Sequence, residues 1–187
     1  MKRIAIFASG TGSNAKNIIN YFSEKPEIKI ECIICNNPKA KVIEVAKENN
    51  IQLYLITKKD LFDSESVVEI LRQRKIDLVV LAGFLWKIPE SMLTSFPNKI
   101  INIHPALLPK YGGAGMYGMR VHKAVIAARE KETGITIHYL NNHYDEGEII
   151  LQKKTSIDEN DSAETIAHKV HLLEFDWLPQ IIEEILS

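Results

Sequence analysis

An amide and an imidazole stand two positions apart in the segment KIINIHP, as Asn102 and His104. The apolar residues around them predict a short strand over 99–105, and side chains two apart in a strand point the same way. An amide beside an imidazole can polarise a carbonyl group and move a proton. A lone histidine is more often a core or surface residue. The neighbouring amide and the glycine-rich loop after Pro105 favour the catalytic interpretation.

A turn later in the chain could supply a carboxylate to the same place. Tyr144-Asp145-Glu146-Gly147 separates two predicted strands, and such a turn can present its side chains at the edge of a sheet. A carboxylate beside His104 would raise the pKa of the imidazole and favour imidazolium. The residue pattern alone does not place Asp145 next to His104.

The loop ASGTGSNAKN, residues 8–17, follows a short apolar run and contains Gly10-x-Gly12-x-x-Ala15. A strand, a glycine turn and a helix present backbone N–H groups to an anion. Ser13 and Asn14 are residue types that cap helices. A dinucleotide also needs an acidic residue at the end of the second strand, where this chain has Cys35-Asn36-Asn37. The loop therefore predicts a binding site for one phosphate group and no binding site for NAD. The alternative is a structural turn that binds no ligand.

Two cysteines and two histidines have spacings that a metal or a redox site can use. Cys32 and Cys35 fall within a predicted buried strand, where residues three apart point to opposite faces. His168 and His171 are three apart on a predicted helix but lack a third ligand. We expect two reduced core thiols and no metal.

The composition is that of an ordinary globular protein, with 45% apolar and 25% charged residues. The formal net charge of −1 indicates no nucleic-acid partner. No apolar run is long enough to span a bilayer, and no signal peptide is visible. These features predict one domain in the cytoplasm, with no membrane partner.

Short apolar runs alternate with amphipathic stretches through the first half of the chain. This alternation predicts an α/β fold with a parallel sheet covered by helices on both faces. The expected strands are 3–8, 28–35, 52–56, 77–83 and 99–105, and the expected helices are 14–23, 39–49 and 64–75. The second half predicts a helix over 119–131, strands over 134–140 and 146–154, and a helix over 162–186 that Pro179 should kink or split.

The motifs GTGSN, LAGF, INIHPALLPKY, TGITIHYL and DEGEIILQ follow one another along the chain. In order and spacing they resemble the phosphoribosylglycinamide formyltransferase family, the folate-dependent enzymes of purine synthesis. The resemblance covers essentially the whole chain. It implies a Rossmann-like, open, mostly parallel sheet with an antiparallel C-terminal extension, in a single domain over 1–187. A phosphate-binding half would cover about 1–98 and a catalytic and folate-binding half about 99–187.

The resemblance also implies an activity. Such enzymes transfer the formyl group of 10-formyltetrahydrofolate to the amino group of glycinamide ribonucleotide, and they use neither a metal nor NAD. The partners would be small molecules, and the chain would be a monomer or a weak homodimer.

Roles for individual residues follow from the same resemblance. His104 would donate a proton, Asn102 would hold the formyl oxygen, and Asp145 would raise the pKa of His104. The ribonucleotide would contact Gly12, Ser13, Asn14, His171 and Glu174. The folate would contact Leu85, Trp86, Lys87, Ile88, Asn102, Asn141, Asn142, His143, Tyr144 and Asp145.

The chain departs from the family pattern at three places. Many relatives carry Met-Arg where this chain has Leu85-Trp86, a change that backbone contacts to folate would tolerate. Many have an arginine where this chain has Glu65, which puts one polar folate contact in question. The segment YGGAGMYGMR, residues 111–120, is longer than in many relatives and could be a lid or an interface element.

Related families offer competing interpretations. Methionyl-tRNA formyltransferase shares the core but carries an additional C-terminal domain. Formyltetrahydrofolate deformylase, the main alternative, usually carries an N-terminal regulatory domain, whereas the first predicted strand here begins at residue 3. A phosphometabolite-binding module without catalysis would require Asn102, His104 and Asp145 to be coincidental.

Overall fold

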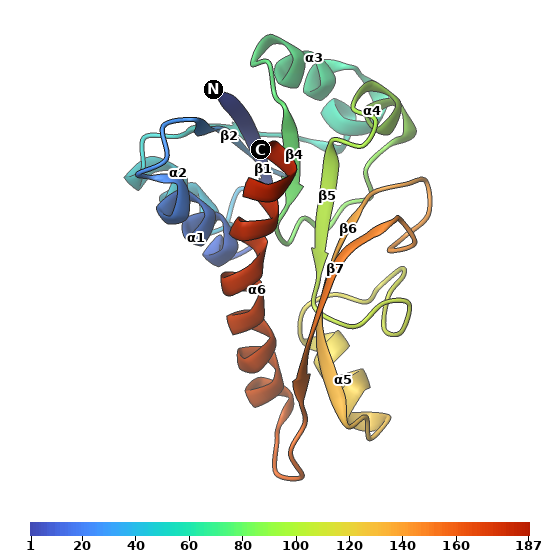
Figure 1. Ribbon diagram of the computed structural model, residues 1–187. Helices are drawn as coiled ribbons and strands as arrows, with labels where there is room; N and C mark the ends of the chain where they lie inside the picture. The colour runs from blue at the N-terminus through green and yellow to red at the C-terminus, as the bar shows by residue number, and fades with distance from the viewer. The chain divides into compact units, whose positions relative to one another are not determined.

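The computed structural model describes all residues of the chain, 1–187 (Figure 1). Strands and helices alternate along most of it. In chain order the elements are β1 (Lys2–Ala8), α1 (Ser13–Phe22), β2 (Ile28–Cys35), α2 (Val42–Glu48), β3 (Gln52–Leu55), the π-helix η1 (Lys59–Asp63), α3 (Ser66–Gln73), β4 (Leu78–Leu81), α4 (Glu90–Ser95), β5 (Ile100–His104), α5 (Met119–Ala127), β6 (Glu132–Tyr139), β7 (Ile149–Ser156) and α6 (Ala163–Leu186).

The strands form a seven-stranded sheet in the order β3-β2-β1-β4-β5-β6-β7. Strand β1 pairs in parallel with β2 and with β4, and β2 pairs in parallel with β3. Strands β6 and β7 are antiparallel. The predicted fold class, a mostly parallel open sheet with an antiparallel extension, is confirmed. The chain separates into two compact units, residues 1–101 with 182–187, and residues 102–181.

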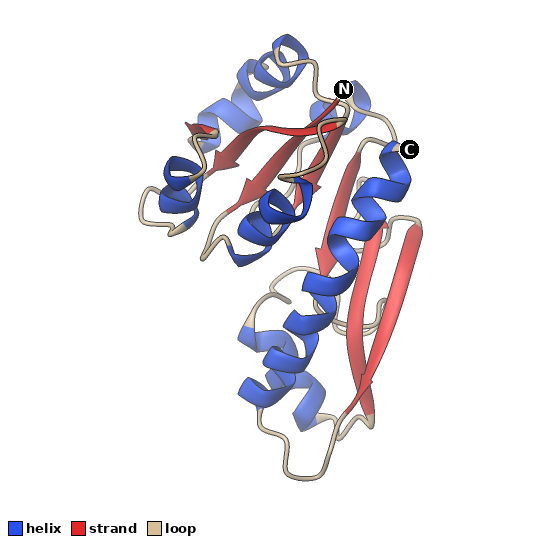
Figure 2. Ribbon diagram, turned by 60° about the vertical axis from the view of Figure 1, so that its left-hand side comes forward, coloured by secondary structure: helices blue, strands red, loops and turns tan.

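The first unit contains an open sheet with helices packed around it (Figure 2), and the strand order reverses at β1. Strands β1 and β4 are buried almost throughout, which explains their continuous apolar runs. Right-handed crossovers place α1 and α2 on one side of these strands and α3 on the other, because the chain turns back after β3. The loops after β1 and β4 therefore flank a topological switch point, where open sheets bind ligands.

The second unit contains the end of β5, the hairpin β6–β7, and α5. The register of the hairpin shifts between Ile137 and His138, so the sheet is irregular next to that histidine. The hydroxyl of Thr136, fully buried, donates to the Ala106 carbonyl (2.7 Å) and accepts from the Leu108 N–H (3.0 Å). These bonds fix the chain just after β5.

The predicted strands and helices are present, with small differences at their ends. Helix α2 begins at Val42, later than expected, and two elements were not predicted: η1 and the short helix α4. Of the predicted kink or split at Pro179, the split is absent, because helix α6 continues through this residue. Both cysteines are buried free thiols, and burial raises the pKa of Cys32 to about 12. None of the helices is long and apolar enough to cross a membrane.

Candidate active site

The loop after β1 is held by its neighbours at the switch point of the first unit. The Ser9 N–H donates to the Gly83 carbonyl (3.1 Å), and the Ser9 hydroxyl accepts from the Leu85 N–H (3.0 Å). The Ser9 carbonyl accepts from the Asn37 side chain (3.1 Å). Asn37 follows β2, where a dinucleotide-binding protein would carry an acidic residue. Here an amide occupies that place and supports the glycine loop.

Helix α1 begins directly after this loop. Its N-cap is Gly12, with a φ of 76°, and no side chain caps it. The expectation that Ser13 or Asn14 would cap the helix is therefore wrong. Both lie within the first turn, and the Ser13 hydroxyl lies 3.3 Å from the Thr11 hydroxyl. The first N–H groups of a helix and two short polar side chains form a suitable environment for an anion.

Gly12 is required by its backbone conformation and by its neighbour. A Cβ atom at this position would lie 2.8 Å from the Val42 backbone, whereas one at Gly10 would meet nothing within 4 Å. A left-handed φ also costs a residue with a side chain about 1–2 kcal/mol. The loop therefore combines a left-handed turn with close packing against α2.

Gly12→Ala is accordingly expected to lower the free energy of unfolding by about 2 kcal/mol and to weaken binding of the ribonucleotide that the resemblance assigns to this loop. Urea unfolding and calorimetric titration measure the two effects. The matched control is Gly10→Ala, which should unfold like the wild type. Equal stability of the two variants would contradict the account of this turn.

The segment after β4 carries the residues predicted to contact folate. Leu85 and Lys87 are exposed, whereas Ile88 is buried. The Trp86 ring packs against Phe84 with centroids 6.2 Å apart and lies 6.4 Å from the Phe62 ring. The side chain that departs from the family pattern thus joins an aromatic cluster. At the other departure, the exposed Glu65 lies 3.9 Å from Arg72.

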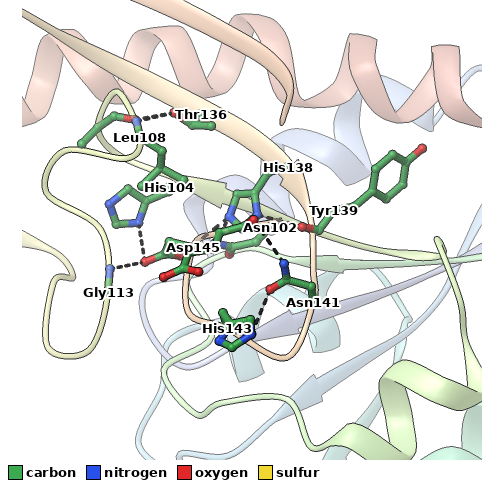
Figure 3. A network of polar contacts seen from close by, with 12 residues as sticks. Asn102, His104, Leu108, Gly113, Thr136, His138, Tyr139, Asn141, His143 and Asp145 are labelled. Carbon is green, nitrogen blue, oxygen red and sulfur yellow. Dashed lines mark hydrogen bonds and ion pairs between the residues drawn. The ribbon is translucent and has the colours of Figure 1, made fainter. Parts of the chain in front are cut away.

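In the second unit, His104 lies at the end of β5 and is buried (Figure 3). Its Nε2 lies 2.8 Å from the Tyr111 carbonyl oxygen. A carbonyl can only accept, so Nε2 carries the proton. Its Nδ1 lies 3.7 Å from Oδ2 of Asp145. The structure therefore brings together His104 and Asp145, which the residue pattern alone did not place.

Asp145 is held in a left-handed backbone conformation, with a φ of 55°. Its Oδ2 accepts from the Gly113 N–H (2.8 Å), and its Oδ1 lies 3.7 Å from Nε2 of His138. Burial disfavours the charged carboxylate, but polar contacts, among them the hydrogen bond from the Gly113 N–H, outweigh it and hold the Asp145 pKa below its usual value. A positive φ in a residue with a side chain is uncommon and is often found at functional sites.

The charge state predicted for His104 needs correction. Asp145 does raise the pKa of His104, but desolvation by burial has the larger, opposite effect. The pKa of His104 therefore lies below its ordinary value, and at neutral pH the unliganded chain favours imidazole over the expected imidazolium. Protonation of Nδ1 would create an ion pair with Asp145, so the carboxylate stabilises the charged form once a proton arrives.

Asn102 lies two residues before His104, as predicted for a pair on one strand. Its Nδ2 lies 3.2 Å from Nε2 of His138, and Nδ1 of His138 lies 2.9 Å from the Tyr139 carbonyl oxygen. His138 lies in β6 and is buried, and its residue type and position gave no sign that it lies between Asn102 and Asp145 (Figure 3).

The loop 111–120 begins at the site. The Tyr111 carbonyl is hydrogen-bonded to His104, and the Gly113 N–H donates to Asp145. Both contacts use backbone groups, which cannot be predicted from the types of the side chains. Tyr111 and Gly113 have positive φ angles, as do Gly115 and Gly118. The many glycines in this loop predicted an irregular backbone. They did not indicate which residues the backbone would contact.

The remaining loop residues lie near the carboxylate. Asn141 closes the turn, since its side chain donates to the Glu146 carbonyl (3.1 Å) and accepts from the His143 N–H (2.8 Å). Asn142, His143 and Tyr144 are exposed. This loop can therefore present backbone and side-chain polar groups to a ligand while it holds Asp145 in place.

On α6, Nδ1 of His171 lies 2.9 Å from Oε2 of Glu174, and the His171 ring packs against Phe175 with centroids 4.1 Å apart. His171 is thus paired with a carboxylate on its own helix. No group of three or more His, Cys, Asp or Glu side chains is placed to hold a metal ion.

Comparison with known proteins gives a consistent result. The formyl transferase family model matches residues 2–182. A curated relative, phosphoribosylglycinamide formyltransferase of Bacillus subtilis (strain 168), is 37% identical over 100% of this chain and 96% of its own length. The solved structure of that enzyme from Bacillus halodurans is 35% identical, with a TM-score of 0.88 over 100% of this chain and 96% of the other. The Anaplasma phagocytophilum structure is 33% identical, with a TM-score of 0.89 over 99% of this chain and 87% of the other.

Proposed function

The chain belongs to the formyl transferase family, and from that premise we propose that it transfers a formyl group to the amino group of phosphoribosylglycinamide. The formyl donor is 10-formyltetrahydrofolate, and the product is formylglycinamide ribonucleotide. The observation that carries the proposal is the group formed by the buried His104 with the half-buried Asn102 and Asp145. An amide donor, a neutral imidazole and a carboxylate suit acyl transfer to an amine.

The proposed reaction begins when the substrate amine attacks the formyl carbon. A C–N bond forms, and the formyl oxygen becomes an oxyanion, which the Asn102 amide stabilises as a hydrogen-bond donor. The amine now carries a surplus proton. His104, neutral in the free chain, accepts this proton, and Asp145 stabilises the resulting imidazolium. His104 then gives the proton to the departing folate nitrogen, directly or through water, as the old C–N bond breaks.

The binding roles are assigned by residue chemistry. The backbone N–H groups at Gly12, Ser13 and Asn14 bind the phosphate of the ribonucleotide. The His171–Glu174 pair offers a carboxylate to the ribose hydroxyls. The folate is held by the segment Leu85 to Ile88 and by the loop 141–145. Trp86, packed in its aromatic cluster, leaves the backbone of that segment to make the polar contacts.

The proposal is tested by measuring folate product by absorbance with and without phosphoribosylglycinamide. Folate should be released only when the ribonucleotide is present. Release at the same rate without it would indicate hydrolysis, the deformylase reaction. Tight binding of both compounds without turnover would indicate a binding module.

A further inference from the structure

Resting on the proposed function, we propose that His138 is a positioning residue that sets which end of the Asn102 amide faces the formyl oxygen. His138 touches neither substrate in this account. It acts through Asn102, and its own hydrogen bonds decide how that amide can turn.

The tautomer of His138 follows from its partner on Nδ1. This nitrogen lies 2.9 Å from the Tyr139 carbonyl oxygen, which can only accept a hydrogen bond. Nδ1 must therefore carry the proton. A neutral imidazole has one N–H, so Nε2 is left with a lone pair and acts as an acceptor.

The orientation of Asn102 follows from that lone pair. Its side chain lies 3.2 Å from Nε2 of His138, and only the amide nitrogen can donate there. One hydrogen of the amide NH₂ is used by His138, and the second remains to donate to the developing oxyanion. The reversed amide would put its oxygen against the His138 lone pair and remove the donor from the formyl group.

The surroundings of His138 hold its ring and the Asn102 amide in this orientation. His138 is only 2% exposed, so water does not compete for Nε2. The register shift between Ile137 and His138 is the kind of irregularity that re-aims a side chain beside a site. Oδ1 of Asp145 lies 3.7 Å from the same nitrogen, too far for a hydrogen bond, so the Asn102 amide is the hydrogen-bond partner of Nε2.

Replacement of His138 should lower kcat more than it raises KM. His138→Leu removes the acceptor, and kcat is expected to fall by about 10²-fold, the loss typical of one oxyanion donor. KM for the ribonucleotide should stay within about threefold, because ground-state binding is not involved. His138→Gln places a carboxamide oxygen near the position of Nε2 and should keep kcat within about tenfold of the wild type.

A double-mutant cycle with Asn102 separates positioning from a purely structural role. In the Asn102→Ala background His138→Leu should lower kcat by less than about threefold, since the group it positions is already gone. Equal losses in both backgrounds, or full activity of His138→Leu, would overturn the inference. If the Leu variant does not fold, the inference is tested with the Gln variant and with nitrogen-15 NMR of the wild type. A proton found on Nε2 of His138 would overturn the inference as well.

The same set of variants distinguishes this inference from the proposed function. Full activity of Asn102→Ala would show that Asn102 has no part in the chemistry, which would remove the catalytic proposal itself. An impaired Asn102→Ala beside a fully active His138→Leu would leave the catalytic proposal intact and remove only the role of His138.

Discussion

His104→Ala is expected to lower kcat by about 10²- to 10⁴-fold, the range associated with loss of a general acid–base group. The physical reason is that His104 is the one titratable group in this account that both takes the proton from the amine and gives it to the folate nitrogen. Binding of the ribonucleotide should change little, because the proposed phosphate site at residues 12–14 is in a different part of the chain. Steady-state kinetics and calorimetric titration measure the two quantities.

His168→Ala is a matched control for this substitution. His168 is an exposed histidine on α6, and no role in the chemistry is assigned to it. Its replacement should leave kcat and affinity unchanged. A large loss of ribonucleotide affinity in His104→Ala, with kcat preserved at saturation, would mean that His104 binds substrate and does not transfer a proton.

Asp145→Asn is expected to lower kcat by about 10²- to 10⁴-fold and to shift the acid side of the pH–rate profile to lower pH. The sign follows from the two opposing effects on His104: burial lowers its pKa and Asp145 raises it. The neutral amide removes the raising effect, so the pKa of His104 falls further. Because neutral His104 is the form that accepts the proton, the activity of the variant should rise at a lower pH than that of the wild type.

The Asn side chain keeps an oxygen that can accept from the Gly113 N–H, so the variant should retain the local fold. Asp176→Asn, an exposed position on α6, is the control and should reproduce the wild-type profile. An unchanged acid side in Asp145→Asn would show that His104 and Asp145 are not coupled.

Much of the fold could be predicted from the sequence, because its signals are local. The buried strands of the first unit are continuous apolar runs, and Gly12 indicated a special turn by its residue type. The π-helix η1 and the short helix α4 were missed because each contains too few residues to show a period.

The site was predicted less completely, because its contacts join distant positions or use the backbone. Asn102 and His104 share a strand, so their common direction could be inferred. Their partners could not: the Tyr111 carbonyl and the Gly113 N–H carry no side-chain signal. The charge of His104 was predicted in the wrong direction because the effect of a neighbouring carboxylate was considered without the cost of burial.

The most direct test of the central claim follows the formyl carbon itself. The enzyme would be mixed with 10-formyltetrahydrofolate labelled with carbon-13 in the formyl group and with phosphoribosylglycinamide, and the products would be identified by mass spectrometry. With formyl transfer as proposed, the label should appear in formylglycinamide ribonucleotide, in amounts equal to the folate released. Label recovered as free formate, with the ribonucleotide unchanged, would contradict it.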